Sequence, residues 1–560
     1  MLPRPSVVIS RAMPAAVLAL VLILSITYLY HSPKSIGSSA DFVRQHLPDI
    51  PAWNSNDYPS PPSNTLSTFS SVALTYTTAE AIPRPSSLPI EYNNDASDSE
   101  FCDNRFNVKY LANLRKASFQ YCDASSYSSF TCFHSHTTDD DESDSLCITQ
   151  GALVDMSVKD DKKFIVNCNV QEPGANNTAR GVIPFGKVRQ YWYDTGPRFI
   201  MDKHFDFALK PQAKLANQPS SRGQELSRMY TLLVKREGEG NPWHCLMEIW
   251  SMAMTMDVLR TAIDPADPKG QPYFRVPEDL SNLQVVILDD RVDGPYFGLW
   301  KLFSGREPIR LNQITGNPEA KEFFNNTNQR LILPLAGATN PVWQNDWKVR
   351  DCTRSDTLRA FVRRVLNHYD IHTSFASAET DQKKRETVRV TVIDRKNANT
   401  RRLANQEALI AALRARYPDI EVQEVDFGAM PFAEQLVIAQ NTDVLVGVHG
   451  AGLTHTMFLR EQSTAVVEIQ PSDMGNAYMG FRNLANMRGI SYFRTKATPV
   501  EEVSEEATAS LKSARNASTL SRRASWHTEN FEIDTGVFIR AVDAGIQVVY
   551  NKNMHSHEIV

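Results

Sequence analysis

The feature that most constrains this chain is an alternation of apolar strand segments with helical segments between residues 388 and 468. Short apolar runs predict strands at Val388–Ile393, Ile420–Val425, Asp443–Val448 and Val466–Val467. The segments between them predict helices at Asn405–Tyr417 and Pro431–Gln440. Apolar strands that alternate with helices form a parallel sheet with helices on both faces. The sequence therefore predicts a doubly wound, Rossmann-like unit here.

A similar pattern precedes this unit. Leu246–Ile263 is a Met-rich helical run, Val285–Leu288 is a short apolar strand, and Leu358–Tyr369 places apolar residues on one helical face. We therefore predict an α/β fold with two Rossmann-like halves and a cleft between them. The cysteine-bearing region and the first half would occupy residues 96–375, the second half residues 376–545, and a tail residues 546–560. No internal sequence repeat supports a duplication directly.

One glycine-bearing loop follows the strand at Asp443–Val448, and its residues are His449, Gly450, Ala451 and Gly452. Ligands of parallel sheets bind beyond the carboxyl ends of the strands. Glycines let the backbone approach an anion closely, and a following helix offers N–H groups and the positive end of its dipole. His449, and also His455, can add side-chain donors.

Three charged residues are predicted at the same edge of the sheet. Glu468 ends the next strand, where an acid can accept the ribose hydroxyls of a nucleotide. Arg395 and Lys396 follow the first strand and supply cations for a diphosphate. Together with the glycine loop they predict a nucleotide-diphosphate site. The alternative is a tight strand–helix connection flanked by ordinary surface charges.

Several other classes are excluded or disfavoured. A lipase-like oxyanion hole needs a G-x-S-x-G turn, which the chain lacks, and it has no lysine-anchored P-loop. The acidic run Asp139-Asp140-Asp141 resembles a metal-binding D-x-D motif but lies in a polar insert, so we expect no metal site. The formal net charge of −5 leaves no broad cationic surface for nucleic acid.

Two residues near the start of the Met-rich helix are candidates for the general base. His244 and Glu248 are four residues apart and therefore share a helical face. Either could take a proton from an acceptor hydroxyl. The alternative is an acid that stabilises a helix terminus and a histidine at the edge of the core. Asp289, Asp290 and Asp293 are rivals for the same catalytic role.

The first residues predict a membrane anchor. Arg4 and Arg11 precede an apolar run from Ala12 to Tyr30, nearly long enough to span a hydrocarbon core of about 30 Å. We expect residues 1–31 to form a cytosolic tail and an uncleaved signal-anchor helix, with a cleaved signal peptide as the alternative. Residues 32–95 are rich in Pro, Ser and Thr and predict an extended stem.

The cysteines and the glycosylation motifs agree with a location of the chain after the anchor in the lumen. Five of the seven cysteines lie between Cys102 and Cys168, a clustering that favours disulfides over a zinc site, since no C-x-x-C pair occurs. The odd total leaves a free thiol, which we expect at Cys245 or Cys352. Motifs for N-glycosylation occur at Asn176, Asn325 and Asn516.

At these residues the chain resembles family 61 glycosyltransferases, in the branch of EGF-domain-specific O-linked N-acetylglucosaminyltransferases. The resemblance extends over about 430 residues. Its motifs are Asn441-Thr442-Asp443 with Gly447 to His455, Phe458-Leu459, Val467-Glu468, Arg395 with Leu403 to Glu407, Trp243-His244 with Glu248, and the region of Cys122, Cys132, Cys147 and Cys168.

The resemblance implies a GT-B fold and a metal-independent, inverting transfer from a UDP-sugar, with no cofactor. Arg395, His449 and Glu468 would hold the donor, and the family's His-x-x-x-acid motif falls on His244 and Glu248, where Asp is the usual acid. The expected activity is transfer of N-acetylglucosamine to Ser or Thr of secretory proteins. A β-1,2-xylosyltransferase acting on glycans and a non-catalytic, lectin-like protein are the alternatives. The tail from His555 to Val560 lacks a retrieval signal, which favours the Golgi over the endoplasmic reticulum.

Overall fold

The computed structural model describes most of the chain from residue 88 onward. The described ranges are 88–92, 98–136, 143–157, 161–207, 228–238, 240–324, 329–371, 387–398, 400–461, 463–474, 478–500, 529–551 and 557–559. Within them, no helix is long and apolar enough to cross a membrane. The apolar run from Ala12 to Tyr30 and most of the predicted stem lie outside these ranges.

The C-terminal part of the chain forms a seven-stranded sheet. Its order is β12 (Glu421–Val425), β11 (Arg389–Ile393), β13 (Val444–Val448), β14 (Ala465–Pro471), β15 (Ser491–Val500) and β16 (Asn530–Glu532), and β17 (His557–Ile559) also pairs with β15. The strands from β12 to β15 are all parallel, and only β16 is antiparallel. The predicted parallel sheet is confirmed, and the predicted strands and helices of this part agree with the observed bounds within one residue or lie inside them.

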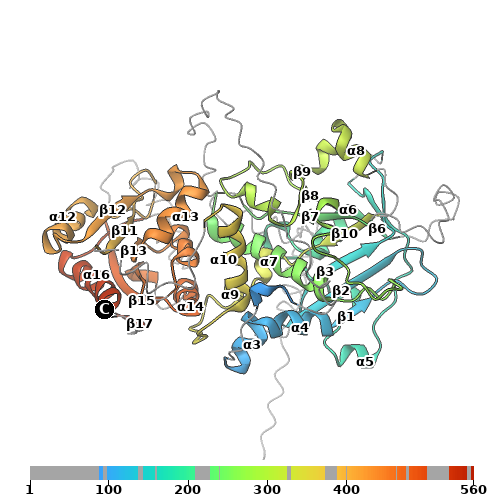
Figure 1. Ribbon diagram of the computed structural model, residues 1–560, viewed down its shortest axis with the longest axis horizontal. Helices are drawn as coiled ribbons and strands as arrows, with labels where there is room; N and C mark the ends of the chain where they lie inside the picture. The colour runs from blue at the N-terminus through green and yellow to red at the C-terminus, as the bar shows by residue number, and fades with distance from the viewer. Residues whose placement is uncertain are drawn as a thin grey trace, which may run out of the picture. The chain divides into compact units, whose positions relative to one another are not determined.

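Helices cover both faces of this sheet (Figure 1). On one face lie α12 (Gln406–Arg416) and α16 (Thr535–Tyr550), whose apolar side chains share a core with alternate residues of β11, β13 and β14. On the other face lie α13 (Phe432–Asn441), α14 (Gly480–Met487) and the 3₁₀ segment η11 (Ala451–Phe458). Burial on both faces explains why these strands are nearly continuous apolar runs.

The N-terminal part forms a second seven-stranded sheet that is mixed, whereas we expected a Rossmann-like, parallel half. Its order is β1 (Ser118–Gln120), β2 (Ser129–His136), β3 (Ser143–Gln150), β10 (Gln329–Leu333), β7 (Met229–Val234), β8 (Leu283–Ile287) and β9 (Ile309–Arg310). The strands from β10 to β9 are parallel, but the cysteine-bearing region adds three antiparallel strands. Short β2–β3 and β1–β2 connections permit only antiparallel pairing, so the parallel pattern stops there.

The helix α7 (Pro242–Thr261) is buried on nearly all sides and lies at the centre of the largest core. It contacts α4 (Val108–Lys116), α10 (Asp356–His368) and η11. Because this core also contains side chains of α13 and α14, apolar packing is continuous from the N-terminal sheet's helices to those of the C-terminal sheet. Tyr92, in the last described residues of the predicted stem, donates a hydrogen bond to Asp257 of α7 at 2.5 Å.

Three disulfides join the cysteine-bearing region, as its composition predicted. They are Cys102–Cys352, Cys122–Cys168 and Cys132–Cys147. Cys245 is the buried free cysteine, so the alternative of a free Cys352 is wrong. A small sheet contains β4 (Leu153–Val154), β5 (Phe164–Val166) and β6 (Phe205–Phe207). The remaining helices are α3 (Glu100–Phe106), α5 (Ala175–Thr178), α6 (Pro197–His204), α8 (Pro318–Phe324) and α9 (Pro341–Gln344).

Candidate functional site

Two loops meet at the carboxyl end of the C-terminal sheet. Ile393, the last residue of β11, packs directly against the glycine-bearing loop that follows β13. A Cβ atom at Gly447 would lie 2.7 Å from the Ile393 side chain, and one at Gly452 would lie 3.1 Å from it. The absence of side chains at these two positions therefore lets the Arg395 loop approach the loop at Gly450.

Two arginine side chains converge on Gly450. A Cβ atom there would lie 3.0 Å from Nη1 of Arg401 and 3.9 Å from Nη1 of Arg395. Burial lowers the pKa of Arg395; burial, and then the charge of Arg395, lowers the pKa of Arg401 to about 10. Among the described residues, the buried Nε of Arg395 has no hydrogen-bond partner. Two partly desolvated cations that repel one another are suited to bind an anion between them.

Arg401 is not among the site residues predicted from the sequence. Its backbone has a φ of +59°, and its N–H donates to the carbonyl of Glu529 at 2.8 Å. Two residues later, Leu403 forms a parallel bridge to Phe531 of β16. Because this position depends on a strand about 130 residues further along the chain, no local pattern could have predicted it. The predicted cation Lys396 instead points its ammonium to Asp394, at 3.0 Å.

His449 and Glu468 lie in direct contact. The Nδ1 atom of His449 is hydrogen-bonded to Oε1 of Glu468, and the hydroxyl of Tyr492 donates to Oε2. Burial, and next the charge of Glu468, raises the pKa of Tyr492. Glu468 has no exposed surface. In this arrangement its carboxylate holds His449 in place, whereas we had expected it to accept ribose hydroxyls.

The glycine loop also offers backbone amides. Gly450 has a φ of +152°, a conformation that side chains disfavour, and it precedes η11. The first amides of η11, from Ala451 and Gly452, have no acceptor within a helical segment and point toward its N-terminus. His455 lies beneath this loop. Its Nδ1 is hydrogen-bonded to the carbonyl of Gly452 at 2.8 Å and its ring is buried against Phe427, with 3.8 Å between centroids. Burial lowers its pKa to about 4.

In the N-terminal part, His244 is paired with an acid that the sequence did not indicate. Its Nδ1 atom lies 3.2 Å from Oε2 of Glu237, a fully buried side chain in the loop before α7. Glu248 is buried below this pair, and its Oε1 accepts the backbone N–H of Glu237 at 2.6 Å. The ring of His244 is partly exposed and contacts the edge of Trp343 at 4.6 Å between centroids. Of the two predicted base candidates, His244 is therefore the accessible one.

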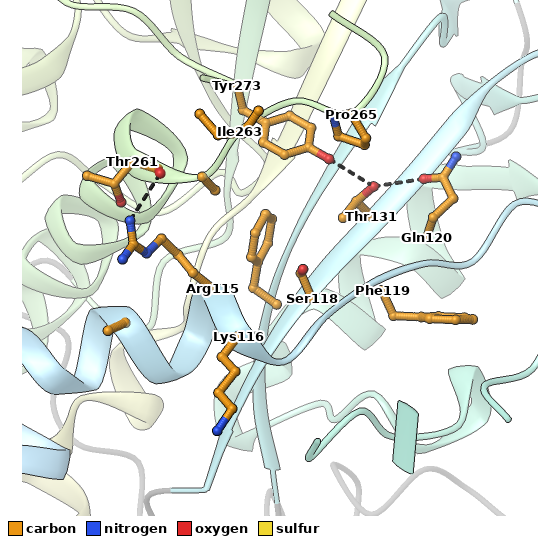
Figure 2. A pocket seen from close by; sticks show the side chains of 13 residues that line it. Arg115, Lys116, Ser118, Phe119, Gln120, Thr131, Thr261, Ile263, Pro265 and Tyr273 are labelled. Atoms are coloured by element: carbon orange, nitrogen blue, oxygen red, sulfur yellow. Dashed lines mark hydrogen bonds between the residues drawn. The ribbon is translucent and has the colours of Figure 1, made fainter. Parts of the chain in front are cut away.

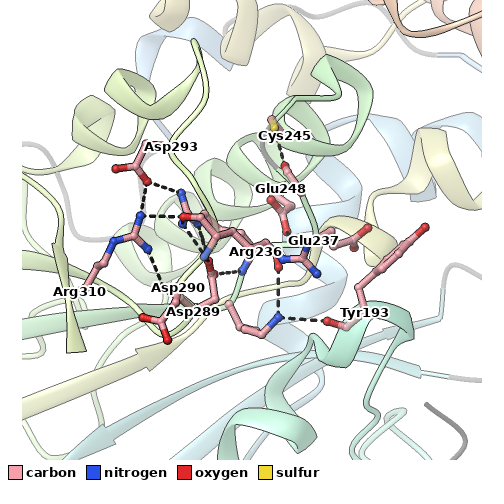
Figure 3. Close-up of polar contacts among 12 residues, drawn as sticks. Tyr193, Arg236, Glu237, Cys245, Glu248, Asp289, Asp290, Asp293 and Arg310 are labelled. Carbon is pink, nitrogen blue, oxygen red and sulfur yellow. Dashed lines mark hydrogen bonds and ion pairs between the residues drawn. The ribbon is translucent and has the colours of Figure 1, made fainter. Parts of the chain in front are cut away.

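Two of the three acidic rivals of His244, Asp289 and Asp293, are held in ion pairs (Figure 3). The buried Arg236 binds Asp289 at 2.8 Å and Asp293 at 2.9 Å, and Arg310 also binds Asp293. Burial would raise the pKa of Asp289, but hydrogen bonds and the charge of Arg236 hold it below its usual value. Asp290 is exposed and accepts from Asn312. The ion pairs make Asp289 and Asp293 poor bases, whereas the contacts of Asp290 leave its carboxylate accessible.

A chain of ring contacts connects the two groups of candidate residues. Trp243, the neighbour of His244, contacts Phe481 of α14 with 5.2 Å between centroids. Phe481 in turn contacts His449 at 5.4 Å. The structure thus brings together Arg395, His449, Glu468 and the glycine loop on one side. It places His244 and Glu248 on the other side, two aromatic rings away.

A cavity of about 520 Å³ lies at the far end of α7 (Figure 2). It is lined by the end of α4, by β1 and β2, and by the loop after Thr261. Thr261 follows His244 by 17 residues, about 25 Å along a helix. The cavity includes none of the candidate site residues, so it does not define this site.

The other predicted sites are only partly within the described residues. Asn176 lies exposed in α5, whereas Asn325, Asn516 and the acidic run at Asp139 lie outside the described ranges. In the part of the chain that the structure describes, no three His, Cys, Asp or Glu side chains are grouped as a metal would need.

Comparison with known proteins identifies the class of this domain. Residues 243–467 match the family model described as Glycosyltransferase 61. The chain therefore contains a glycosyltransferase family 61 domain, which confirms the resemblance inferred from the motifs. The match runs from Trp243 at the start of α7 to Val467 in β14, so it includes His244, Arg395 and the glycine loop.

Curated relatives narrow the comparison. The chain is 31% identical over 201 residues to the EGF domain-specific O-linked N-acetylglucosamine transferase of Drosophila melanogaster, covering 36% of this chain and 35% of the relative. It is 34% identical over 195 residues to the protein of the same name from Mus musculus, covering 34% and 33%. The aligned region thus spans about a third of the length of these relatives.

Proposed function

We propose that this protein transfers N-acetylglucosamine from UDP-N-acetylglucosamine to Ser or Thr hydroxyls of secretory proteins. The observation that carries the proposal is the convergence of Arg395 and Arg401 on Gly450, beside the His449–Glu468 pair. The family 61 domain supports glycosyl transfer in general. The names of the relatives support N-acetylglucosamine as the sugar and EGF domains as acceptors.

The donor would bind with its diphosphate at the carboxyl ends of β11 and β13. Arg395 and Arg401 would pair with the phosphate oxygens, and the first amides of η11 would donate to them. The bond between the Glu468 carboxylate and Nδ1 directs Nε2 of His449 away from Glu468, and with both ring nitrogens protonated Nε2 would donate to a phosphate oxygen. This arrangement would stabilise the negative charge that develops on the departing UDP, without a metal ion or a cofactor.

His244 would act as the general base. The acceptor oxygen attacks the anomeric carbon of the sugar, the bond from that carbon to the phosphate oxygen breaks, and the hydroxyl proton passes to His244. Glu237, hydrogen-bonded to Nδ1, would orient the ring and stabilise its protonated form. Glu248 would support this pair by holding the backbone of Glu237. A direct attack of this kind inverts the anomeric configuration.

The proposal also includes the arrangement of the two halves and the orientation of the chain in the membrane. The two sheets and the continuous core beside α7 and α14 are compatible with a GT-B arrangement in which donor and acceptor meet between two halves. The apolar run from Ala12 to Tyr30 would anchor the protein in the Golgi or endoplasmic reticulum membrane with its catalytic part in the lumen. The three disulfides agree with an oxidising compartment.

The test is release of UDP by the full-length chain, produced in a eukaryotic secretory pathway and purified in mild detergent. The donors would be UDP-N-acetylglucosamine, UDP-xylose, UDP-glucose and UDP-galactose, each with a folded EGF domain as the acceptor. We expect release from UDP-N-acetylglucosamine, unchanged by EDTA, and a β-linked product by NMR. Preferred use of UDP-xylose on a glycan would replace the proposed donor and acceptor. No turnover and no binding of UDP by calorimetry would refute the proposal.

A further inference from the structure

One buried acid has no role in the site described so far. Asp346 follows α9, and only 8% of its surface is exposed. Its backbone N–H donates to the carbonyl of Trp343 at 3.2 Å, and its carbonyl accepts the N–H of Met479. The Oδ1 atom of its carboxyl group is buried without a hydrogen-bond partner among the described residues. Most buried polar side-chain atoms are hydrogen-bonded, so this atom requires an explanation.

Asp346 lies where the segment after α9 meets the start of α14. A Cβ atom at Gly480 would lie 3.0 Å from Cβ of Asp346 and 3.0 Å from the ring of Trp243. A side chain at residue 480 would therefore crowd both neighbours, and glycine relieves this contact. Because Trp243 precedes His244, this contact brings Asp346 beside the start of the helix that carries the proposed base.

Aromatic rings surround this acid on the side of the candidate nucleotide site. Tyr478 contacts the ring of His449 at 5.6 Å and the ring of Trp347 at 4.6 Å between centroids. Tyr478 precedes Met479, whose N–H is bonded to the carbonyl of Asp346, so the two residues are near in the fold. Burial, and next the charge of Asp346, raises the pKa of Tyr478. Trp347 is 56% exposed, so part of this aromatic surface is open to solvent.

The protein does not compensate the burial of this acid. Burial raises the pKa of Asp346 to about 7, and the bond of its own backbone N–H is the single opposing contribution. Removing a carboxylate from water without hydrogen bonds costs several kcal/mol. A buried carboxyl group with an unpaired oxygen suits a ligand that supplies hydrogen-bond donors. The hydroxyl groups of a sugar are such donors.

We propose that Asp346 accepts hydrogen bonds from hydroxyl groups of the donor's sugar ring, with Tyr478 and Trp347 offering ring faces to its C–H groups. This inference rests on the proposed function, since it extends the nucleotide site from the diphosphate to the sugar. The position of Asp346 agrees with it, because the acid lies between His449 on the nucleotide side and the helix of His244 on the acceptor side. Asp346 would thus contribute to selection of the sugar and not to affinity for UDP.

The experiment compares the affinities of UDP and of the preferred UDP-sugar by calorimetry in the full-length chain. Asp346→Asn keeps the size of the side chain but removes the carboxylate. The matched control is Asp351→Asn, at an exposed acid five residues further on that pairs with Arg482. We expect Asp346→Asn to change the Kd of UDP by less than twofold. The ratio of the Kd of UDP to the Kd of the UDP-sugar should fall at least tenfold, and kcat/KM should fall by the same factor. Asp351→Asn should change neither.

A second measurement begins with the unaltered protein, so its first result does not depend on the folding of a variant. UDP-sugars that lack single ring hydroxyls should include one or two that bind at least tenfold more weakly than the complete donor. Asp346→Asn should no longer distinguish them from that donor. If the variant binds and transfers the sugar as the wild type does, or if every deoxy donor binds normally, the role of Asp346 is refuted. A wild-type chain that binds neither UDP nor a UDP-sugar would refute the proposed function as well.

Discussion

The guanidinium groups of Arg395 and Arg401 both approach Gly450: a Cβ atom there would lie 3.9 Å and 3.0 Å from their Nη1 atoms. Their proximity has a cost, because burial and the charge of Arg395 lower the pKa of Arg401 to about 10. A bound anion would offset this repulsion, so variants of the two arginines test the nucleotide site most directly.

Replacing Arg401 with Gln should weaken UDP binding by about 10- to 100-fold, the effect of losing a charge-assisted hydrogen bond to phosphate. Arg395→Gln should have a similar effect. The loss should shrink as the salt concentration rises, because ions screen the remaining charges. Arg416→Gln, at an exposed arginine at the end of α12, is the control and should bind UDP normally. Equal Kd values by calorimetry for Arg401→Gln and the wild type would remove Arg401 from the site.

The His244–Glu237 pair leads to a prediction about rate. His244→Gln should lower kcat by about 10²- to 10⁴-fold, the range for loss of a general base, and leave the Kd of UDP unchanged. Glu237→Gln should lower kcat by a smaller factor and preserve UDP binding, since it removes the orienting carboxylate and not the base. Asp290→Asn, at the exposed rival acid, should keep full activity. A normal kcat for His244→Gln would show that another group takes the proton.

A feature of the fold could be predicted from the sequence where neighbouring residues determine it, and could not where it depends on contacts between distant segments. The strands and helices from β11 to β14 agree with the sequence prediction because each apolar run specifies its own burial on both faces of a parallel sheet. The mixed N-terminal sheet could not be predicted in this way. Its strands β7 and β8 are local apolar runs, but β2 and β3 are joined to them only through β10, nearly 200 residues away.

The residues of the candidate site likewise fall into two groups: those marked by a local sequence pattern and those positioned by distant contacts. His449 and Arg395 could be proposed from the sequence because both lie just after predicted strands, and the chemistry of strand ends is general. Arg401, Glu237 and Asp346 were missed. Each acquires its position from a distant contact or a loop: Arg401 from Glu529, Glu237 from Glu248 across a turn, and Asp346 from Met479. No periodicity or motif marks such positions, so only the structure reveals them.

Asp346 also predicts an unusual dependence of stability on pH. Its pKa is raised from 3.8 to about 7 in the folded chain, so the folded state holds a proton that the unfolded state has released. The free energy of unfolding should therefore fall as the pH rises from about 4 to about 7, by about 4 kcal/mol from this group. Asp346→Asn should raise the Tm at pH 8 and change it little at pH 4.

The comparison must be made between the variant and the wild type at each pH. The buried His204 and His455 have pKa values of about 4, lowered from 6.5 by burial. They make stability increase between pH 4 and pH 6.5, which opposes the effect of Asp346. The difference in Tm between Asp346→Asn and the wild type cancels their contribution. A difference that stays constant from pH 4 to pH 8 would contradict the raised pKa.

Glu468 contacts both His449 and Tyr492. Variants at these positions can therefore distinguish the orientation of His449 from the packing of the buried cluster as a requirement for UDP binding. The carboxylate of Glu468 is hydrogen-bonded to His449, Tyr492 and Nε2 of Gln470. Glu468→Gln replaces it with an amide that can accept only at its oxygen, so at least one buried donor loses its partner. We expect the free energy of unfolding to fall by about 1–3 kcal/mol and UDP to bind about tenfold more weakly as His449 loses its orientation. Tyr492→Phe removes one donor and leaves His449 bonded to Glu468, so its UDP affinity should stay within about twofold of the wild type. Because both variants disturb the same buried cluster, a weaker binding of UDP in Glu468→Gln alone would assign the effect to His449, whereas equal losses in both would assign it to packing.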